Sequence, residues 1–242
     1  MKSGVFISFE GSEGCGKSTQ IALLADRLRK LSYPNVIVLR EPGSTLIGDE
    51  IRHTLKHSAD NYAMTAEAEL LLMNASRAQL VREIIRPALA AGKIVLCDRF
   101  YDSTTAYQGY GRELDLQWVK SVVDFAVGET RPDLTLLLSV PIEVSEARRL
   151  ARRENQQTLL IDVPVPDKRP ESHAKLPFSE PLRDRMEEAD RDFFERVVKG
   201  FKAIAAAEPN RVRVVDSSGL PVTTFEKVWE LVRPVLPKIG RW

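Results

Sequence analysis

The residues best suited to chemistry lie near the start of the chain, in a glycine-rich stretch that ends in lysine and serine. Residues 11–18 read GSEGCGKS and fit the phosphate-binding pattern G-x-x-x-x-G-K-[ST], between an apolar run and a helical pattern. Glycines let backbone N–H groups turn toward a phosphate, Lys17 can neutralise the β- and γ-phosphates, and the Ser18 hydroxyl suits a magnesium ion. The pattern therefore predicts a nucleoside triphosphate ligand.

A second group of polar residues follows the apolar run at residues 94–97, in the stretch CDRFYDSTTAYQG. Asp98, at the end of this run, is placed to hold the shell of a magnesium ion through water, and Arg99 follows it at the binding edge. Hydroxyls, a ring and an amide come next, and they suit a sugar and a base: Ser103, Thr104, Tyr107 and Gln108.

Phosphoryl transfer benefits from an arginine at the transferred group, yet the glycine-rich stretch contains none. A cluster of arginines lies instead on a predicted helix just before the long insert, in RRLARR, residues 148–153, where Arg148 and Arg152 share one helical face. We expect Arg152 or Arg153 to act on the transferred phosphoryl group, with Arg185 as a further candidate. The alternative is a solvated basic face at a helix end.

Apolar β-rich runs alternate with helical patterns along the chain. The predicted strands are residues 5–9, 36–39, 94–97, 134–140 and 212–215, and the predicted helices are 18–31, 66–90, 116–128, 142–153, 181–207 and 223–236. This order predicts a parallel sheet covered by helices on both sides, with ligands bound outside the carboxyl ends of the strands. The fold class is therefore α/β.

One segment, residues 154–181, interrupts the alternation, because it is rich in proline and has no sustained period. It is either a surface excursion or an extension of a lid over the site. We expect one domain over residues 1–242, with a lid region at about 148–185 that includes this insert.

Composition narrows the functional classes. With 242 residues, 43% hydrophobic and 29% charged, and a net charge of +1, the chain is an ordinary globular protein with no sign of a nucleic-acid partner. Two cysteines, Cys15 and Cys97, predict reduced thiols in the cytoplasm, and neither a signal peptide nor a membrane span is expected. The chain lacks the guanine-reading Asn-Lys-x-Asp of regulatory GTPases, which favours a small kinase.

Six motifs occur together and in order: FEGSEGCGKST, LREPGST, ASRAQ, CDRFYDSTTAYQG, RPDLTLLL and DRME. In this combination the chain resembles bacterial thymidylate kinases from about residue 5 to residue 187. The resemblance implies transfer of the γ-phosphoryl group of ATP to dTMP, giving dTDP. It also implies a three-layer P-loop kinase fold with five parallel strands, a homodimer and a requirement for magnesium.

The resemblance also implies roles for individual residues. The ATP-binding residues would be Gly11, Ser12, Glu13, Gly14, Cys15, Gly16, Lys17, Ser18, Thr19 and Arg148. Glu13 matches the acid that reaches the deoxyribose 3′-hydroxyl, and Arg99 matches the arginine on the acceptor phosphate. Arg77 matches the arginine that bonds the base. Tyr107 matches the ring beside the sugar 2′ position, and Gln108 lies next to the thymine edge.

Two positions depart from the family pattern. Met73 stands where the family usually carries a phenylalanine that stacks on thymine, and a methionine selects less sharply for a flat base. Ser44 replaces the second glycine of EPGG, a residue free to take positive φ. A kinase for another deoxynucleoside monophosphate therefore stays an alternative, as does a catalytically silent nucleotide-binding module.

Overall fold

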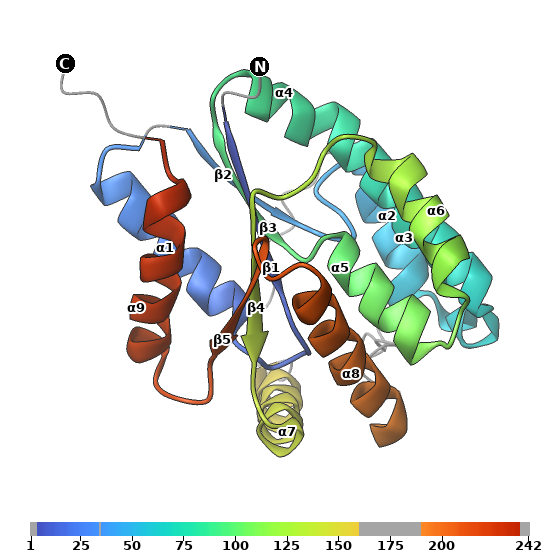
Figure 1. Ribbon diagram of the computed structural model, residues 1–242. Helices are drawn as coiled ribbons and strands as arrows, with labels where there is room; N and C mark the ends of the chain where they lie inside the picture. Colours follow the sequence, from blue (N-terminus) through green and yellow to red (C-terminus); the bar gives the residue numbers. More distant parts are fainter. Residues whose placement is uncertain (1–3, 34, 160–189, 238–242) are drawn as a thin grey trace.

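The computed structural model describes residues 4–33, 35–159 and 190–237, which form a sheet between two layers of helices (Figure 1). The sheet contains β1 (Val5–Glu10), β2 (Val36–Arg40), β3 (Ile94–Asp98), β4 (Leu134–Ser139) and β5 (Val212–Asp216). All neighbours are parallel, in the order β2-β3-β1-β4-β5. The predicted five-stranded parallel sheet is therefore confirmed.

Helices cover both faces of this sheet. The helices are α1 (Lys17–Lys30), α2 (Leu46–His57), α3 (Ala66–Leu80), α4 (Arg86–Ala90), α5 (Tyr101–Thr104), α6 (Leu116–Val127), α7 (Ile142–Leu159), α8 (Arg191–Ala207) and α9 (Pro221–Val232). Figure 1 shows α1 and α9 together on one side, and α2, α3, α4, α6 and α8 on the other. The crossover helices alternate with the strands because parallel neighbours need long connections.

The two-residue period of a strand explains the two cores. Ile7 and Phe9 face α1 and α9, whereas Phe6, between them in the sequence, packs against the layer that contains α3 and α6. All three side chains are fully buried. Burying both faces requires strands that are apolar throughout, which is the pattern that the sequence shows.

The structure differs from the predicted elements in three places. The sequence analysis missed α2, although Thr45 caps it by accepting a hydrogen bond from Gly48 N and the side chains of Ile47, Ile51 and Leu55 recur with helical spacing. It also assigned no helix to the segment after Arg99, where α5 runs into a π-helical segment at Thr105–Gly111.

The third difference concerns the end of α7. The proline-rich insert was predicted to begin at residue 154, but α7 continues to Leu159, because residues 154–159 contain no proline. The rest of the insert, residues 160–181, lies outside the described residues, and so does Arg185. The predicted helix over residues 66–90 is present as α3, a π-helical turn (Val81–Ile85) and α4.

Candidate active site

The phosphate-binding loop connects β1 to α1. Gly11, Gly14 and Gly16 adopt φ values of 131°, 76° and 95°, in the region where a side chain is strained. At Gly11 a Cβ would also lie 2.3 Å from the backbone oxygen of Leu138. These glycines thus permit the tight turn, and Gly16 ends it at the N-terminus of α1. Lys17, the first residue of α1, donates hydrogen bonds from Nζ to the carbonyls of Gly11 (3.1 Å) and Ser12 (2.9 Å).

Ser18 and Asp98 meet beside this loop. Ser18 Oγ donates a hydrogen bond of 2.9 Å to Asp98 Oδ2, although 80 residues separate them in sequence. The parallel register pairs Phe9 of β1 with Asp98 of β3, which places the carboxyl ends of these two strands side by side. Ser18 and Thr19 are exposed on the first turn of α1.

Arg99 lies between the loop and the nucleoside-binding candidates. Its φ is 70°, and its Nη1 donates to Gly11 O at 3.0 Å and to Ser103 Oγ at 3.1 Å. Its Nη2 donates to the hydroxyl of Tyr107 at 3.3 Å, and the guanidinium carbon lies 5.0 Å from the centroid of the Tyr107 ring. Glu13 Oε1 is 3.6 Å from Nη2.

The electrostatics of this group keep Arg99 charged. Burial by itself would lower the pKa of Arg99, but its electrostatic interactions with Tyr107, Glu13 and Asp98 hold the pKa above its ordinary value. Burial raises the pKa of Tyr107 despite the nearby cation. The site therefore presents a fixed positive charge and a neutral phenol next to the phosphate-binding loop.

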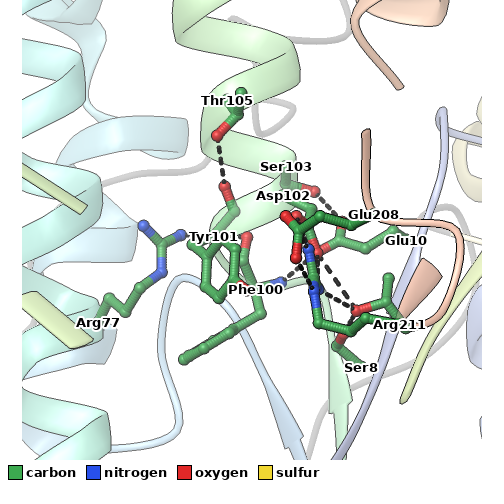
Figure 2. Close-up of polar contacts among 11 residues, drawn as sticks. Ser8, Glu10, Arg77, Phe100, Tyr101, Asp102, Ser103, Thr105, Glu208 and Arg211 are labelled. Atoms are coloured by element: carbon green, nitrogen blue, oxygen red, sulfur yellow. Dashed lines mark hydrogen bonds and ion pairs between the residues drawn. The ribbon is translucent and has the colours of Figure 1, made fainter. Parts of the chain in front are cut away.

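Arg77 occupies a second buried position, on α3. Its Nε donates to Glu41 Oε2 at 2.7 Å, its Nη1 to Asn74 Oδ1 at 2.8 Å, and its Nη2 to Phe100 O at 3.3 Å. Burial raises the pKa of Glu41 to about 7, against the opposing effect of Arg77. Figure 2 shows Arg77 lying beside the turn that carries Phe100 and Tyr101.

The remaining nucleoside-binding candidates are divided among several environments. Gln108 is buried and donates to Glu69 Oε1 at 2.8 Å, and Glu69 also pairs with Arg112. Met73 packs against the cluster that contains Tyr107 and the aromatic side chains of α8. Thr104 is almost fully buried in α5. The structure thus brings Ser103 and Tyr107 to Arg99, whereas Gln108 contacts a neighbouring acidic side chain.

Three acidic residues that were not predicted as site residues accept hydrogen bonds from the candidates: Glu10 from Ser103, Glu41 from Arg77 and Glu69 from Gln108. Each is buried. Glu10 and Glu41 directly follow strand residues in the motifs FEG and REPG, so an acid at a strand end was the available signal. The signal for Glu69 is weaker, because an acid near a helix start commonly serves the helix dipole.

Residues from the start of α7 contact the loop on its outer side. Ser145 Oγ donates to Glu13 O at 2.6 Å, and Arg148 Nη1 donates to Gly14 O at 3.2 Å and to Ser217 O at 3.3 Å. Ser217, in the turn after β5, in turn donates from Oγ to Cys15 O at 2.8 Å. The N-terminal half of α7 and this turn therefore hold the phosphate-binding loop from outside.

Arg149 is the next arginine along α7. Its guanidinium lies 4.1 Å from the centroid of the Phe194 ring, and its Nε and Nη1 atoms are buried without a hydrogen-bond partner in the described part of the chain. The side chains of Arg152 and Arg153, the predicted transferring arginines, lie outside the described residues.

The parallel sheet order, the phosphate-binding loop after the central strand and the arginine facing it define a P-loop kinase. A family model described as thymidylate kinase matches residues 9–162. A thymidylate kinase of Geobacter sulfurreducens is 45% identical over 97% of this chain and 99% of the relative. One of a Synechococcus strain is 42% identical over 96% of both chains.

A solved structure agrees with these relatives. The crystal structure of thymidylate kinase from Ehrlichia chaffeensis superposes with a TM-score of 0.68 at 29% identity, over 95% of this chain and 99% of that one. The chain belongs to the thymidylate kinase family. It is a phosphotransferase that moves the γ-phosphoryl group of ATP to dTMP, giving ADP and dTDP.

Proposed function

We propose that the phosphates of ATP bind in the loop from Gly11 to Thr19 and that Arg99 holds the phosphate of dTMP. One observation carries the proposal: Arg99 donates to the backbone of that loop through Nη1 and to Tyr107 through Nη2. The guanidinium thereby links the donor-phosphate loop to a residue proposed for the nucleoside. An acceptor phosphate on Arg99 would face a γ-phosphate held by Lys17, and such positioning with charge stabilisation is most of what phosphoryl transfer needs.

The nucleoside end of the proposal uses the buried groups around Tyr107. Glu13 and Tyr107 are assigned to the sugar, with Ser103 and Thr104 beside them. The base is assigned to Arg77, Gln108 and Met73. The role of Arg77 is supported by three hydrogen bonds, one from each nitrogen of its guanidinium, which hold the side chain in place. A donor that is already held in place loses little entropy on binding.

Measurement of kcat/KM for dTMP, dUMP, dCMP and dGMP with saturating ATP tests this assignment. We expect dTMP to give the highest value. The Arg99→Lys variant keeps the charge but loses the two-pronged fork, so its kcat/KM for dTMP should fall strongly while the KM for ATP changes little. An equal or better rate on a non-thymine acceptor would overturn the choice of acceptor, and normal kinetics for Arg99→Lys would overturn the role of Arg99.

We also propose that magnesium binds at Ser18 and Asp98. The residues fit such an ion, because a hydroxyl and a carboxylate oxygen lie 2.9 Å apart at the edge of the phosphate-binding loop, and Mg²⁺ prefers oxygen ligands shared with phosphates and water. When bound, the ion would neutralise charge on the transferred phosphate. Asp98→Asn should raise the magnesium concentration needed for half-maximal activity, whereas an unchanged requirement would exclude Asp98.

For residues 1–242 we propose a single kinase domain with a lid at about 148–185, in which Arg148 binds ATP and Arg152 or Arg153 acts on the transferred phosphoryl group. Support comes from Arg148, which contacts the loop backbone at Gly14 from the same helix. Replacing Arg152 and Arg153 by alanine in turn should lower kcat far more than it weakens ATP binding. Arg213→Ala, at an exposed site on β5, is the control. Near-normal kcat in both lid variants would contradict the assignment.

A homodimer is the proposed assembly, formed through α6. Trp118 (73% exposed) and Phe125 (83% exposed) lie two turns apart on one face of α6, and Leu71 on the adjoining α3 is also exposed. Clustered apolar side chains of this size mark interaction surfaces. In analytical ultracentrifugation, Phe125→Asp should be a monomer and wild type a dimer. As the control, Leu220→Asp changes a side chain that is 72% exposed just before α9, and this variant should stay a dimer. A dimeric Phe125→Asp would exclude this face.

The cytoplasm is the proposed location. Both cysteines, Cys15 and Cys97, are free thiols, which suits a reducing compartment. Among the helices that the structure describes, none has the length and apolar character to cross a membrane. Fractionation of cells that express the tagged chain would test the location.

A further inference from the structure

Glu10 is a buried carboxylate that none of the roles above uses. It is the last residue of β1, and its side chain has no exposed surface. Oε1 accepts a hydrogen bond of 2.7 Å from Phe100 N, and Oε2 accepts one of 2.5 Å from Ser103 Oγ. Both donors belong to the turn and helix that follow Arg99, and Figure 2 shows Glu10 pointing toward them.

A carboxylate at this position is costly. Burial and the charge of Asp102 raise the pKa of Glu10 to about 8, and the bonds from Ser103 and Phe100 together with the charge of Arg99 only partly oppose the rise. A buried polar group of this kind is retained where its geometry is needed, so the partners of Glu10 indicate its use.

The two partners lead to Arg99 by different routes. Phe100 N belongs to the peptide bond that follows Arg99, whose φ of 70° is an uncommon backbone conformation for a side-chain-bearing residue. When Glu10 is ionised, Ser103 Oγ gives its single proton to Glu10, so its lone pairs are left to accept from Arg99 Nη1 at 3.1 Å. One route holds the backbone of Arg99 and the other holds its guanidinium.

We propose that Glu10 is a positioning residue for Arg99, which it orients through the Phe100 amide and the Ser103 hydroxyl. The proposal rests on the function assigned above to Arg99. Glu10 itself touches no substrate in this scheme. It sets the direction of the Ser103 hydroxyl, and this direction decides whether Ser103 can accept from the guanidinium.

The Glu10→Gln substitution tests the proposal because it keeps the shape and changes one hydrogen bond. The new amide can still accept from Phe100 N, but its NH₂ group must donate toward Ser103 Oγ. Ser103 then faces two donors, and its contact with Arg99 weakens. The assays are run above pH 8, where Glu10 is ionised, because a protonated Glu10 could donate to Ser103 as the amide does. Under these conditions we expect kcat/KM for dTMP to fall by about 10- to 100-fold, as for a hydrogen bond to a charged group, with the KM for ATP unchanged.

A double-mutant cycle separates positioning from a general structural effect. In the Ser103→Ala background Glu10→Gln should cost much less, because the relay is already broken. Thr105→Val is the matched control: Thr105 donates only to Tyr101 O (3.4 Å) in the adjoining turn, and this variant should keep wild-type kinetics. If Glu10→Gln unfolds, Glu10→Asp is the second variant: its side chain is one methylene shorter, which withdraws the carboxylate from Phe100 N and Ser103 Oγ, so it should show the same selective loss for dTMP.

Three outcomes overturn the proposal: wild-type dTMP kinetics in folded Glu10→Gln, equal losses for ATP and dTMP, or additive losses with Ser103→Ala. The Arg99→Lys variant distinguishes this failure from failure of the proposed function. If Arg99→Lys impairs dTMP use and Glu10→Gln does not, only the positioning role is wrong. If Arg99→Lys has normal kinetics, the assigned function of Arg99 is wrong.

Discussion

The ion pair between Asp102 and Arg211 should contribute strongly to folding, because it is buried and bidentate. Arg211 Nη1 lies 2.7 Å from Asp102 Oδ2, and Arg211 Nη2 lies 2.8 Å from Asp102 Oδ1. Thr135 Oγ1 accepts from Arg211 at 2.7 Å and contacts Ser8 Oγ at 2.7 Å. This network joins α5 to the strands β1 and β4 and to the turn before β5.

Removing one partner leaves the other charged and buried. The exposed fractions of the two side chains are 3% for Asp102 and 13% for Arg211. Breaking such a pair from one side costs about 3–5 kcal/mol, which is a large part of a typical unfolding free energy. Arg211→Ala should cost more than Asp102→Ala, because Arg211 keeps Glu208 as a second partner when Asp102 is lost.

The assay is urea denaturation followed by circular dichroism at neutral pH. The pair Lys30–Asp26 is the control, since its N···O distance is also 2.7 Å but its side chains are 72% and 57% exposed. Lys30→Ala should cost less than about 1 kcal/mol. The double variant Asp102→Leu/Arg211→Met should be more stable than either alanine variant. Alanine variants as mild as Lys30→Ala would refute the reasoning, because burial would then have no effect.

Three further predictions concern single sites. Because the pKa of Glu10 is raised from 4.5 to about 8, the native state holds its proton more tightly than the unfolded chain does. The contribution of this group to stability is therefore complete below 4.5 and lost as the pH rises to about 8. As the pH rises over this range, the free energy of unfolding of Glu10→Gln, measured in urea, should increase relative to that of wild type by up to about 1.4 kcal/mol per pH unit. Parallel plots of unfolding free energy against pH for the two proteins would contradict this. Ser44 has a φ of 70°, and its hydroxyl bridges the backbone N and O of Arg40. In the same unfolding assay, Ser44→Ala should be less stable than Ser44→Gly by about 1 kcal/mol, because alanine is strained in the left-handed region. A Ser44→Gly variant less stable than Ser44→Ala would exclude this strain. Cys15 and Cys97 are buried, and burial raises the pKa of Cys97 well above its usual value. A thiol reagent should therefore label neither cysteine in the native protein and both after denaturation. Rapid labelling of Cys15 in the native protein would show that the loop from Gly11 to Ser18 opens.

The phosphate-binding loop and the strands could be predicted from local sequence patterns. The loop from Gly11 to Ser18 could be predicted because its glycines and Lys17 are close in sequence and the motif encodes its own backbone geometry. The five strands could be predicted because strands buried on both faces need continuous apolar runs. The helix α2 was missed although its N-cap and its helical spacing were present, because the sequence analysis assigned no element to the segment after the motif LREPGST.

Contacts between residues that are distant in sequence could be identified only from the tertiary structure. Arg77 and Glu41 are 36 residues apart, and Glu10 and Ser103 are 93 residues apart, and nothing in local spacing pairs them. The register of β1 against β3 brings these strand ends together, and burial then decides the charge state and partners of each acid. The sequence by itself determined that the chain holds a nucleotide phosphate, because that task is local. The sequence also placed Arg99 at the binding edge, but only the packing of the sheet decided which buried groups surround it, because those groups come from distant parts of the chain.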